Sequence, residues 1–397
     1  MTYAFSDRMA SLQPSAIREI LKNTSSPDVI PFAAGNPAPE AFPLKEIENI
    51  TRIIMGDNPV AALQYSVSEG YPALRDAAFS FAEKREPGIR KPGDTILIVS
   101  GAQQGIELAA KCLINEGDTV LSEDPSFVGA LNALRSYHPN LVGVPMEEDG
   151  MNLDALEKAM QTQPNVKLLY IIPNFQNPTG ITTNLEKRKA IYELCKRYGV
   201  MILEDNPYGD LRFDGSYIPA IKTMDTEGLV IYVGSFSKII SPGLRVGYVI
   251  ANSDFMAKMV VAKQCSDVHT NILAQMVCER FLISCNMNSH LLGLQKIYKS
   301  NAALLIKCLE EHTAGRLTWR APQGGMFIWC TLPEGSDMVA FCKKAAEAKV
   351  AVVPGSAFLT DPSEPCRSFR MNYSTPSNKQ IISGCEIMGG VLKDFLR

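Results

Sequence analysis

One lysine in this sequence stands in surroundings that could make it a nucleophile. Lys238 lies in the stretch SFSKIISPGLRVGY, just after the apolar run LVIYVG, which predicts a buried strand ending near Gly234. In open α/β sheets, ligands bind at the carboxyl ends of the strands. Poor solvation there favours the neutral amine, which can form a Schiff base with an aldehyde. A lysine taken alone is better explained as a surface residue after a strand, so the other motifs must decide.

Two further motifs place polar side chains at predicted strand ends. In EDNPYG, residues 204–209, Asp205 could face a protonated ring nitrogen, which would keep a bound ring cationic and electron-accepting. Glu204 would point to the opposite side of the strand, where we expect a structural role. In PNFQNPTG, residues 173–180, Asn177 could donate a hydrogen bond to a ligand oxygen or simply shape the turn before the next proline. The length of this run favours ligand binding.

A third motif could bind phosphate. SGAQQG, residues 100–105, joins a predicted strand to a predicted helix through Gly101. The free N–H groups of Ala102 and Gln103, together with the helix dipole, suit an anion. The motif matches neither the dinucleotide fingerprint nor the P-loop, so on its own an ordinary strand–helix turn explains it better. Phe127, in DPSFVG, also follows a strand end and could stack on a planar ring or pack in the core.

These motifs must be positioned by the alternating strands and helices of the chain. Apolar strand-like runs alternate with helical stretches, one of which ends at Gly199, a C-cap glycine. The alternation predicts an α/β fold with a mostly parallel sheet and helices on both faces. The expected strands span residues 94–101, 118–125, 165–175, 200–207 and 229–238, and the expected helices 102–115, 126–137 and 184–199.

The character of the chain changes near residue 290. Residues 291–312 predict one long helix, and shorter strand-like runs follow, which indicates a small α+β domain. These runs are 324–332, 350–358 and 367–374. The N-terminus predicts an arm with a short helix over 14–23. We therefore expect an N-terminal arm in 1–44, a large domain in 45–290 and a small C-terminal domain in 291–397.

Composition argues against several other classes of protein. The net charge of −3 gives no basic surface for nucleic acid, and no apolar run approaches the roughly 20 residues of a membrane span. The N-terminus is mixed and polar, without a secretion signal. Ten scattered cysteines without a C-x-x-C motif predict reduced thiols in a cytoplasmic protein. Four separated histidines give no basis for a metal site, and we expect none.

In this order, the motifs resemble those of the pyridoxal-phosphate enzymes of fold type I, the class I/II aminotransferases. The resemblance is carried by QYSVSEGYPALRDA, SGAQQGIELA, NFQNPTG, EDNPYGDLRF, SFSKIISPGLRVGY and FRMNYS, and it runs from about residue 8 to the C-terminus. Within that superfamily, the chain looks most like the kynurenine/2-aminoadipate aminotransferase branch. The resemblance implies that the large domain, 45–290, has a mostly parallel sheet and binds the cofactor. It also implies a smaller α+β domain built from both termini, with part of 1–44 joining 291–397, and a homodimer with shared active sites.

The resemblance also assigns roles around the cofactor, pyridoxal 5'-phosphate. Lys238 would hold it as a Schiff base and then act as the base that moves the α-proton. Asp205 would pair with the pyridine nitrogen, while Asn177 and Tyr208 would hydrogen-bond the phenolic oxygen. Phe127 would stack on the ring, where many relatives carry Tyr. The residues implied to bind the phosphate are Gly101, Ala102 (where close relatives have Ser), Gln103, Ser235, Ser237, Arg245 and Tyr65 from the neighbouring subunit.

For the substrate, the resemblance implies a carboxylate site. Arg370 would take the α-carboxylate through a bidentate pair, beside Asn177. Gly35 would let the backbone approach that carboxylate closely. Arg18, in the arm, could meet a distal carboxylate such as that of 2-aminoadipate, or could be a solvated helix residue.

These roles predict a transaminase that moves an amino group between an L-amino acid and a 2-oxo acid, with 2-oxoglutarate as the expected acceptor. Aromatic, branched-chain and 2-aminoadipate-like donors remain open. One alternative is a C–S β-lyase, which keeps the cofactor but ends in β-elimination. Another is a catalytically idle ligand-sensing domain of the kind some bacterial transcription regulators carry. Such a regulator needs roughly 60 to 70 residues of helix–turn–helix before the aminotransferase pattern, which here begins almost at the N-terminus.

Overall fold

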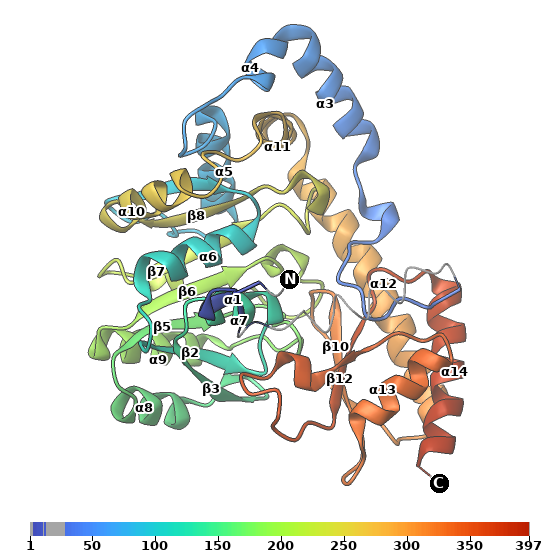
Figure 1. Ribbon diagram of the computed structural model, residues 1–397. Coiled ribbons are helices and arrows are strands. Elements are labelled where there is room, and N and C mark those ends of the chain that lie inside the picture. The colour runs from blue at the N-terminus through green and yellow to red at the C-terminus, as the bar shows by residue number, and fades with distance from the viewer. Residues whose placement is uncertain (1–2, 11, 13–27, 397) are drawn as a thin grey trace.

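The computed structural model describes residues 3–10, 12 and 28–396, with a large sheet at the centre of the molecule (Figure 1). Within the described residues this sheet has eight strands, in the order β1-β8-β7-β6-β5-β2-β3-β4. They are β1 (Asp94–Val99), β2 (Thr119–Asp124), β3 (Asn140–Glu147), β4 (Gly150–Met151), β5 (Val166–Ile171), β6 (Met201–Asn206), β7 (Val230–Ser235) and β8 (Gly247–Asn252).

The long strands of this sheet, except β8, all point the same way. Neighbours from β3 through β2, β5 and β6 to β7 pair in parallel, whereas β8 runs antiparallel to both β7 and β1. β1 therefore has the direction of β7, although β8 lies between them. The carboxyl ends of β1, β2, β5, β6 and β7 consequently meet at one edge. This confirms the predicted α/β fold with a mostly parallel sheet.

Helices bury both faces of the sheet. Along β6, Ile202 and Leu203 are both fully buried, and they belong to the cores on opposite faces. Glu204 lies on the Ile202 face and accepts hydrogen bonds from the backbone N–H groups of Ile221 and Lys222, at 2.8 Å each. Its predicted structural role is thereby confirmed. The covering helices are α8 (Leu153–Thr162) and α9 (Leu185–Tyr198) on the Ile202 face, and α6 (Ala102–Leu113) and α7 (Val128–Arg135) on the other.

Most of the remaining helices of this part pack against α11 or against β1 and β8. α3 and α4 stand out from the body in Figure 1, and both contact α11, as does α5. None of the helices in the described ranges combines the length and apolarity needed to cross a bilayer. Their bounds are α1 (Asp7–Ala10), α3 (Leu44–Asp57), α4 (Pro59–Leu63), α5 (Pro72–Arg85), α10 (Ser253–Gln264) and α11 (Ile272–Ser284).

A second sheet, with strand order β11-β12-β10-β9, lies beside the first (Figure 1). The long helix α12 passes between the two parts and packs along α14, and Ile30 forms a parallel bridge with Val350. The N-terminal segment therefore joins the part built mainly by the C-terminus, while the domain boundaries given above stay a prediction. The elements are α12 (Met287–Thr313), β9 (Thr318–Trp319), β10 (Phe327–Thr331), α13 (Met338–Glu347), β11 (Val353–Pro354), β12 (Ser368–Asn372) and α14 (Asn378–Phe395).

One predicted strand is largely absent. The run 350–358 yields only the two residues of β11, followed by the 3-10 turn Gly355–Phe358. Pro354 has no N–H to extend the ladder. Gly355 packs so closely that a Cβ there would lie 2.2 Å from the carbonyl oxygen of Ser368. The chain turns here, which brings Phe358 toward the active-site edge of the large sheet.

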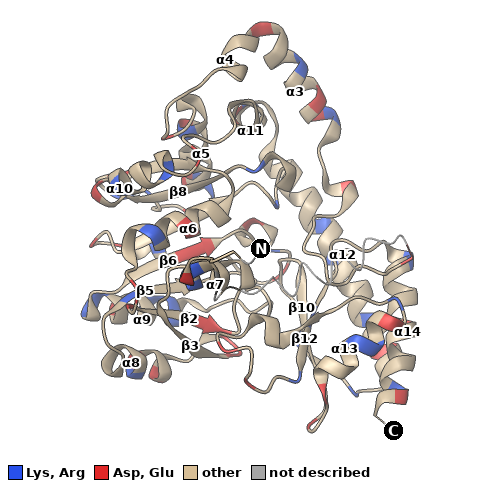
Figure 2. Cartoon of the chain, in the orientation of Figure 1, with Lys and Arg blue, Asp and Glu red and all other residues tan. Residues whose placement is uncertain are grey.

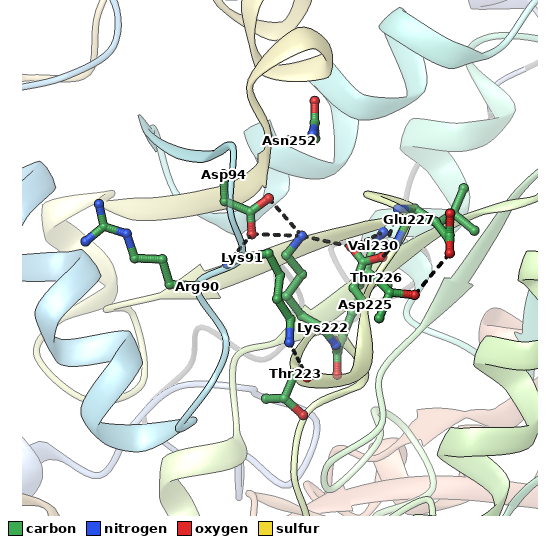
Figure 3. A network of polar contacts seen from close by, with 12 residues as sticks. Arg90, Lys91, Asp94, Lys222, Thr223, Asp225, Thr226, Glu227, Val230 and Asn252 are labelled. Carbon is green, nitrogen blue, oxygen red and sulfur yellow. Dashed lines mark hydrogen bonds and ion pairs between the residues drawn. The ribbon is translucent and has the colours of Figure 1, made fainter.

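A buried ionic network holds the opposite, amino-terminal edge of the large sheet (Figure 3). Lys222 is fully buried and donates to Asp94 at the start of β1, 3.1 and 3.2 Å from its two carboxylate oxygens, and to Asp225 at 2.9 Å. Asp225 also accepts from the backbone N–H of Val230, the first residue of β7. Every charge in this cluster has a partner, so the network fixes the strand starts without leaving a group free to react.

Candidate active site

A cavity of about 390 Å³ opens at the carboxyl ends of the strands. β1, β2, β5, β6 and β7 each contribute the residues that follow them, and the second sheet contributes β10 and β12. Twelve of the predicted site residues line it: Gly35, Ala102, Gln103, Phe127, Asn177, Asp205, Tyr208, Ser235, Ser237, Lys238, Arg245 and Arg370. The strand directions explain why motifs more than 300 residues apart meet in one place.

The turn between β1 and α6 forms one corner of the cavity. Gly101 adopts φ 81°, and its missing side chain leaves room for the guanidinium of Arg245, which would otherwise lie 2.4 Å from a Cβ. Arg245 donates to the carbonyl of Ser100 at 3.1 Å. The first N–H groups of α6 and the buried hydroxyls of Ser235 and Ser237 complete this corner. A cation, two hydroxyls and a helix N-terminus together suit a phosphate.

Lys238 lies just past β7 and reaches across the cavity. Its Nζ donates to the carbonyl oxygen of Gly35 at 2.8 Å. No carboxylate of the described residues forms an ion pair with it. Burial, with smaller contributions from the charges of Arg370 and Arg245, lowers the pKa of Lys238 to about 8. On the order of a tenth to a fifth of this amine is therefore neutral and nucleophilic near physiological pH, far more than for an ordinary lysine.

Asp205 lies near the end of β6 and lines the same cavity. Its Oδ2 accepts a hydrogen bond from the hydroxyl of Tyr170 at 2.8 Å, whereas its buried Oδ1 has no partner. Burial raises the pKa of Asp205 to about 7, against the lowering effect of the Tyr170 bond. A buried carboxylate oxygen left unpaired is costly, so this oxygen needs a donor that the described residues do not supply.

Arg370, on β12, faces Lys238 from the second sheet. Its side chain is buried, with Nη1 donating to Asn177 Oδ1 at 2.7 Å and Nη2 to the carbonyl of Ala33 at 2.9 Å. Its Nε has no partner, and no carboxylate of the described residues pairs with it. Burial lowers the pKa of Arg370 to about 10, so it stays cationic at neutral pH. The guanidinium is a cation without a counter-ion among the residues that the structure describes.

Tyr208 and Phe127 both line the cavity. The Tyr208 hydroxyl is hydrogen-bonded to the side chain of Asn177, and burial raises its pKa well above the usual value. Phe127 is partly buried at the start of α7, and Gln103 beside it donates to the carbonyl of Gly129 at 2.8 Å. The walls thus combine an aromatic face with hydrogen-bonding groups, as a planar polar ligand requires.

Among the described residues, two predicted site residues, Gly101 and Tyr65, do not line the cavity. Gly101 lies behind the phosphate corner, and Arg18 is outside the described residues. Tyr65 is 83% exposed and contacts the ring of His269 edge-on, with 5.7 Å between ring centroids. Nothing in the described part of this chain places Tyr65 against its own cavity.

Five residues that line the cavity were not predicted from the sequence. They are Ile106, Ile172, Pro207, Pro242 and Phe327. Ile172 and Pro207 directly follow the strands β5 and β6, so their position could have indicated them. Phe327 begins β10 in another part of the chain, and no sequence pattern near it points to the large sheet. The described residues also hold no group of three or more His, Cys, Asp or Glu side chains arranged to bind a metal.

The sequence model of the family described as Aminotransferase class I and II matches residues 27–387.

The chain belongs to this aminotransferase family.

Similar proteins agree with the family match. The chain is 37% identical over 397 residues to aromatic-amino-acid aminotransferase 1 of Thermococcus litoralis, covering 99% of this chain and 95% of that protein. Kynurenine aminotransferase of Pyrococcus horikoshii, solved with PMP and with kynurenine as substrate, superposes with a TM-score of 0.94 at 34% identity, covering 99% and 98% of the two chains. LysN, the alpha-aminoadipate aminotransferase of Thermus thermophilus, solved with N-(5'-phosphopyridoxyl)-L-leucine, gives 0.90 at 35% identity, covering 99% and 98%.

The protein is accordingly a pyridoxal-phosphate-dependent transaminase of fold type I, as the motifs predicted. Its cavity fits that cofactor on structural grounds. The orphaned Oδ1 of Asp205 lacks the donor that a protonated pyridine nitrogen would provide. The corner at Gly101 and Arg245 has the groups a phosphate needs, and Lys238 presents an amine between them.

Proposed function

We propose that this aminotransferase moves amino groups from aromatic and 2-aminoadipate-like L-amino acids to 2-oxoglutarate, with the residues of the cavity in the roles given below. One observation carries the proposal. Lys238, the unpaired oxygen of Asp205 and the counter-ion-free guanidinium of Arg370 all face one cavity. An amine, an acid and a carboxylate receptor are the groups that transamination needs.

Lys238 has two tasks in this proposal. When bound, pyridoxal phosphate supplies an aldehyde and an electron-accepting pyridine ring. Lys238 would supply the amine that tethers the aldehyde, and its lowered pKa leaves far more of this amine neutral than in an ordinary lysine. Once an amino acid had taken its place on the aldehyde carbon, the freed Nζ would accept the α-proton of the substrate and deliver it to that carbon, on the far side of the transferred nitrogen.

The other residues hold and tune the site. Asp205 accepts the pyridine N–H on Oδ1, and this pairing favours its ionised form and keeps the ring cationic. Asn177 and Tyr208 hydrogen-bond the ring's phenolic oxygen, while Phe127 stacks on the ring face. The phosphate is held by Gly101, Ala102, Gln103, Ser235, Ser237 and Arg245.

Arg370 receives the substrate's α-carboxylate. A carboxylate gives this buried cation its counter-ion and can occupy the free Nε. Gly35, whose carbonyl already accepts from Lys238, leaves space beside it. The same pocket takes the 2-oxo acid in the return half of the reaction. For the distal side-chain carboxylate of 2-aminoadipate, Arg18 stays a prediction.

We further propose an active homodimer in which Tyr65 serves the partner's phosphate site. Tyr65 is 83% exposed and does not line its own cavity, and its neighbours Val60 (72%), Leu63 (72%) and Val67 (49%) are exposed as well. A cluster of exposed apolar side chains of this kind is typical of a protein–protein interface. All ten cysteines are free, which supports a reducing compartment, and we propose the cytoplasm.

The donor screen tests the substrate assignment. The purified holoenzyme is offered aromatic, branched-chain and dicarboxylic L-amino acids, each with 2-oxoglutarate, and glutamate formation is measured. We expect the highest kcat/KM among the aromatic amino acids and 2-aminoadipate. Turnover of other amino acids alone would contradict the substrate class.

A subunit-mixing experiment tests the shared site. Tyr65→Phe and Lys238→Ala proteins are mixed at limiting cofactor, and subunit exchange is verified with a tag. With random pairing about half the dimers are mixed, and one site in each has both residues, so about a quarter of wild-type activity should return. If Tyr65 serves its own subunit, no site is complete and nothing returns.

A further inference from the structure

Two phenylalanine rings enclose the guanidinium of Arg370. Its Cζ lies 4.1 Å from the ring centroid of Phe327 and 5.0 Å from that of Phe358. Both distances are well inside the roughly 6 Å at which a cation is attracted to an aromatic face. The two rings come from separate elements, Phe327 from the start of β10 and Phe358 from the turn after β11.

Sheet register explains the first of these contacts. Arg370 on β12 pairs directly with Trp329 on β10, and Phe327 lies two residues from Trp329 on the same face. Phe327 is therefore the diagonal neighbour of Arg370, within reach of a long side chain. Phe358 is brought in by the chain reversal at Pro354 and Gly355 and is fully buried.

Each ring is itself braced by a second aromatic side chain. Tyr208 meets Phe327 edge-on at 5.8 Å and 85°, and Trp329 meets Phe358 edge-on at 5.9 Å and 81°. The carbonyl of Phe358 also accepts from the backbone N–H of Ser126, which lies with Phe127 in the connection between β2 and α7. The rings are thus held from both sides and tied to the cofactor edge.

The polar partners of Arg370 do not by themselves explain its fixed position. Two neutral acceptors bind Nη1 and Nη2, the Nε is free, and the cation has no counter-ion among the described residues. An arginine has many rotamers, and a guanidinium that left this orientation would have to be brought back before a carboxylate could bind.

We propose that Phe327 and Phe358 form an aromatic clamp that holds Arg370 in its carboxylate-binding orientation before substrate arrives. The proposal rests on the assignment of Arg370 to the α-carboxylate. Phe327 also lines the cavity and can touch the substrate, whereas Phe358 is outside the lining and acts only through Arg370. Phe358 is therefore a positioning residue for carboxylate recognition.

The aromatic clamp should affect ligands that carry a carboxylate and leave other ligands unaffected. Removing the Phe358 ring lowers the fraction of enzyme whose Arg370 is correctly oriented, and the apparent affinity for carboxylates falls by that fraction. The range of cation–π strengths corresponds to about a 3- to 30-fold loss. A ligand without a carboxylate does not use Arg370, so its behaviour should not change.

The experiment uses holoenzymes of wild type, Phe358→Met and Phe358→Leu. Phe358→Met retains volume and lacks the ring. The Kd of 3-phenylpropionate is measured by calorimetry, and 2-phenylethylamine, which has no carboxylate, is followed through the cofactor's absorbance. We expect the Kd of the acid to rise about 3- to 30-fold in both variants, with the amine rate constant within about twofold of wild type. Phe341→Leu, an equally buried phenylalanine that contacts Phe369 and Phe395 instead, is the matched control and should change neither.

The outcomes distinguish the aromatic clamp from the assignment of Arg370 to the α-carboxylate, on which the clamp rests. If Arg370→Lys binds 3-phenylpropionate as tightly as wild type, Arg370 is not the carboxylate receptor, and both proposals fail. If Arg370→Lys weakens binding but the Phe358 variants do not, the clamp alone is wrong. An equal loss for acid and amine would also overturn it, since that pattern indicates general disruption. Should the Phe358 variants fail to fold, Trp329→Leu, which removes the ring that braces Phe358 and lies outside the cavity lining, is measured with the same two probes and must show the same selective loss.

Discussion

The large sheet has one buried lysine near the amino-terminal ends of its strands and another near their carboxyl-terminal ends, and the two have opposite surroundings. At the amino-terminal edge, Lys222 is surrounded by the carboxylates of Asp94 and Asp225, all within 3.2 Å (Figure 3). At the carboxyl edge, Lys238 has one neutral acceptor, the carbonyl of Gly35. The wider distribution of charged residues in Figure 2 shows most of them along helices and loops, so these inner clusters are exceptions.

The difference separates a structural site from a reactive one. Around Lys222 every charge is paired within the cluster, so its amine is fully engaged in structural contacts. At the other edge the Oδ1 of Asp205 and the Nε of Arg370 lack partners, and the pKa of Lys238 falls to about 8. Unpaired buried groups reduce stability, and they persist where a ligand completes them. The account therefore predicts that the two edges respond differently to equivalent changes.

The largest effect is expected at Lys238. Lys238→Ala removes both the tether and the base, so transamination should fall by at least about 10³-fold while the melting temperature stays near that of wild type. Activity is measured as glutamate formation and stability by thermal unfolding. Near-normal turnover in this variant would remove Lys238 from the reaction.

Lys222→Met should show the reverse pattern. It leaves Asp94 and Asp225 as buried charges without their common partner, and breaking such a pair costs about 3–5 kcal/mol of unfolding free energy. Urea unfolding measures the loss, and the folded fraction should retain its kcat. If Lys222→Met kept its stability but lost activity, Lys222 would have a role in the reaction, and its assignment as a structural residue would be wrong.

Arg370→Lys should produce a smaller but general loss. The ammonium keeps the charge but not the planar fork, so we expect kcat/KM to fall about 10- to 100-fold for every amino and oxo acid, with cofactor still bound. Arg197→Lys, at an exposed ion pair with Glu157, is the matched control and should be silent. A loss confined to dicarboxylic substrates would assign Arg370 to the distal carboxylate instead.

The smallest expected effect is a pH-dependent stabilisation of the cofactor-free protein by Asp205→Asn. Burial raises the pKa of Asp205 to about 7, from roughly 3.9 in the unfolded chain, so its contribution to stability is lost as pH rises through this window. Asparagine does not titrate and can still accept from Tyr170. The variant's melting temperature should match wild type near pH 4 and exceed it by about 1–4 °C at pH 8. If the difference in melting temperature stayed constant with pH, the pKa of Asp205 would not be raised in the folded protein.

The sequence predicted the parts of the site that follow strands. Each of these positions lies at or shortly after the end of an apolar run, and parallel strands bring such positions together. They are Lys238, Asp205, Asn177, Phe127 and the phosphate turn. This argument needs only local pattern and strand direction.

Contacts between distant elements could not be predicted in this way. Phe327 reaches Arg370 through the register of β10 with β12. Phe358 reaches it through a chain reversal at Gly355, within the run 350–358 that the sequence predicted to be a continuous strand. The pairing of Lys222 with Asp94 likewise joins residues 128 positions apart. Such contacts depend on how the two sheets and their connections pack, which no local pattern encodes.

Borohydride reduction of the holoenzyme tests the central claim most directly. The reduced protein is digested, and the phosphopyridoxyl group is located by mass spectrometry. The account predicts that the group is attached to Lys238 and that the buried lysines Lys222 and Lys263, which are paired with carboxylates, carry none. Attachment at Lys222, Lys263 or any other lysine, with Lys238 unmodified, would contradict it.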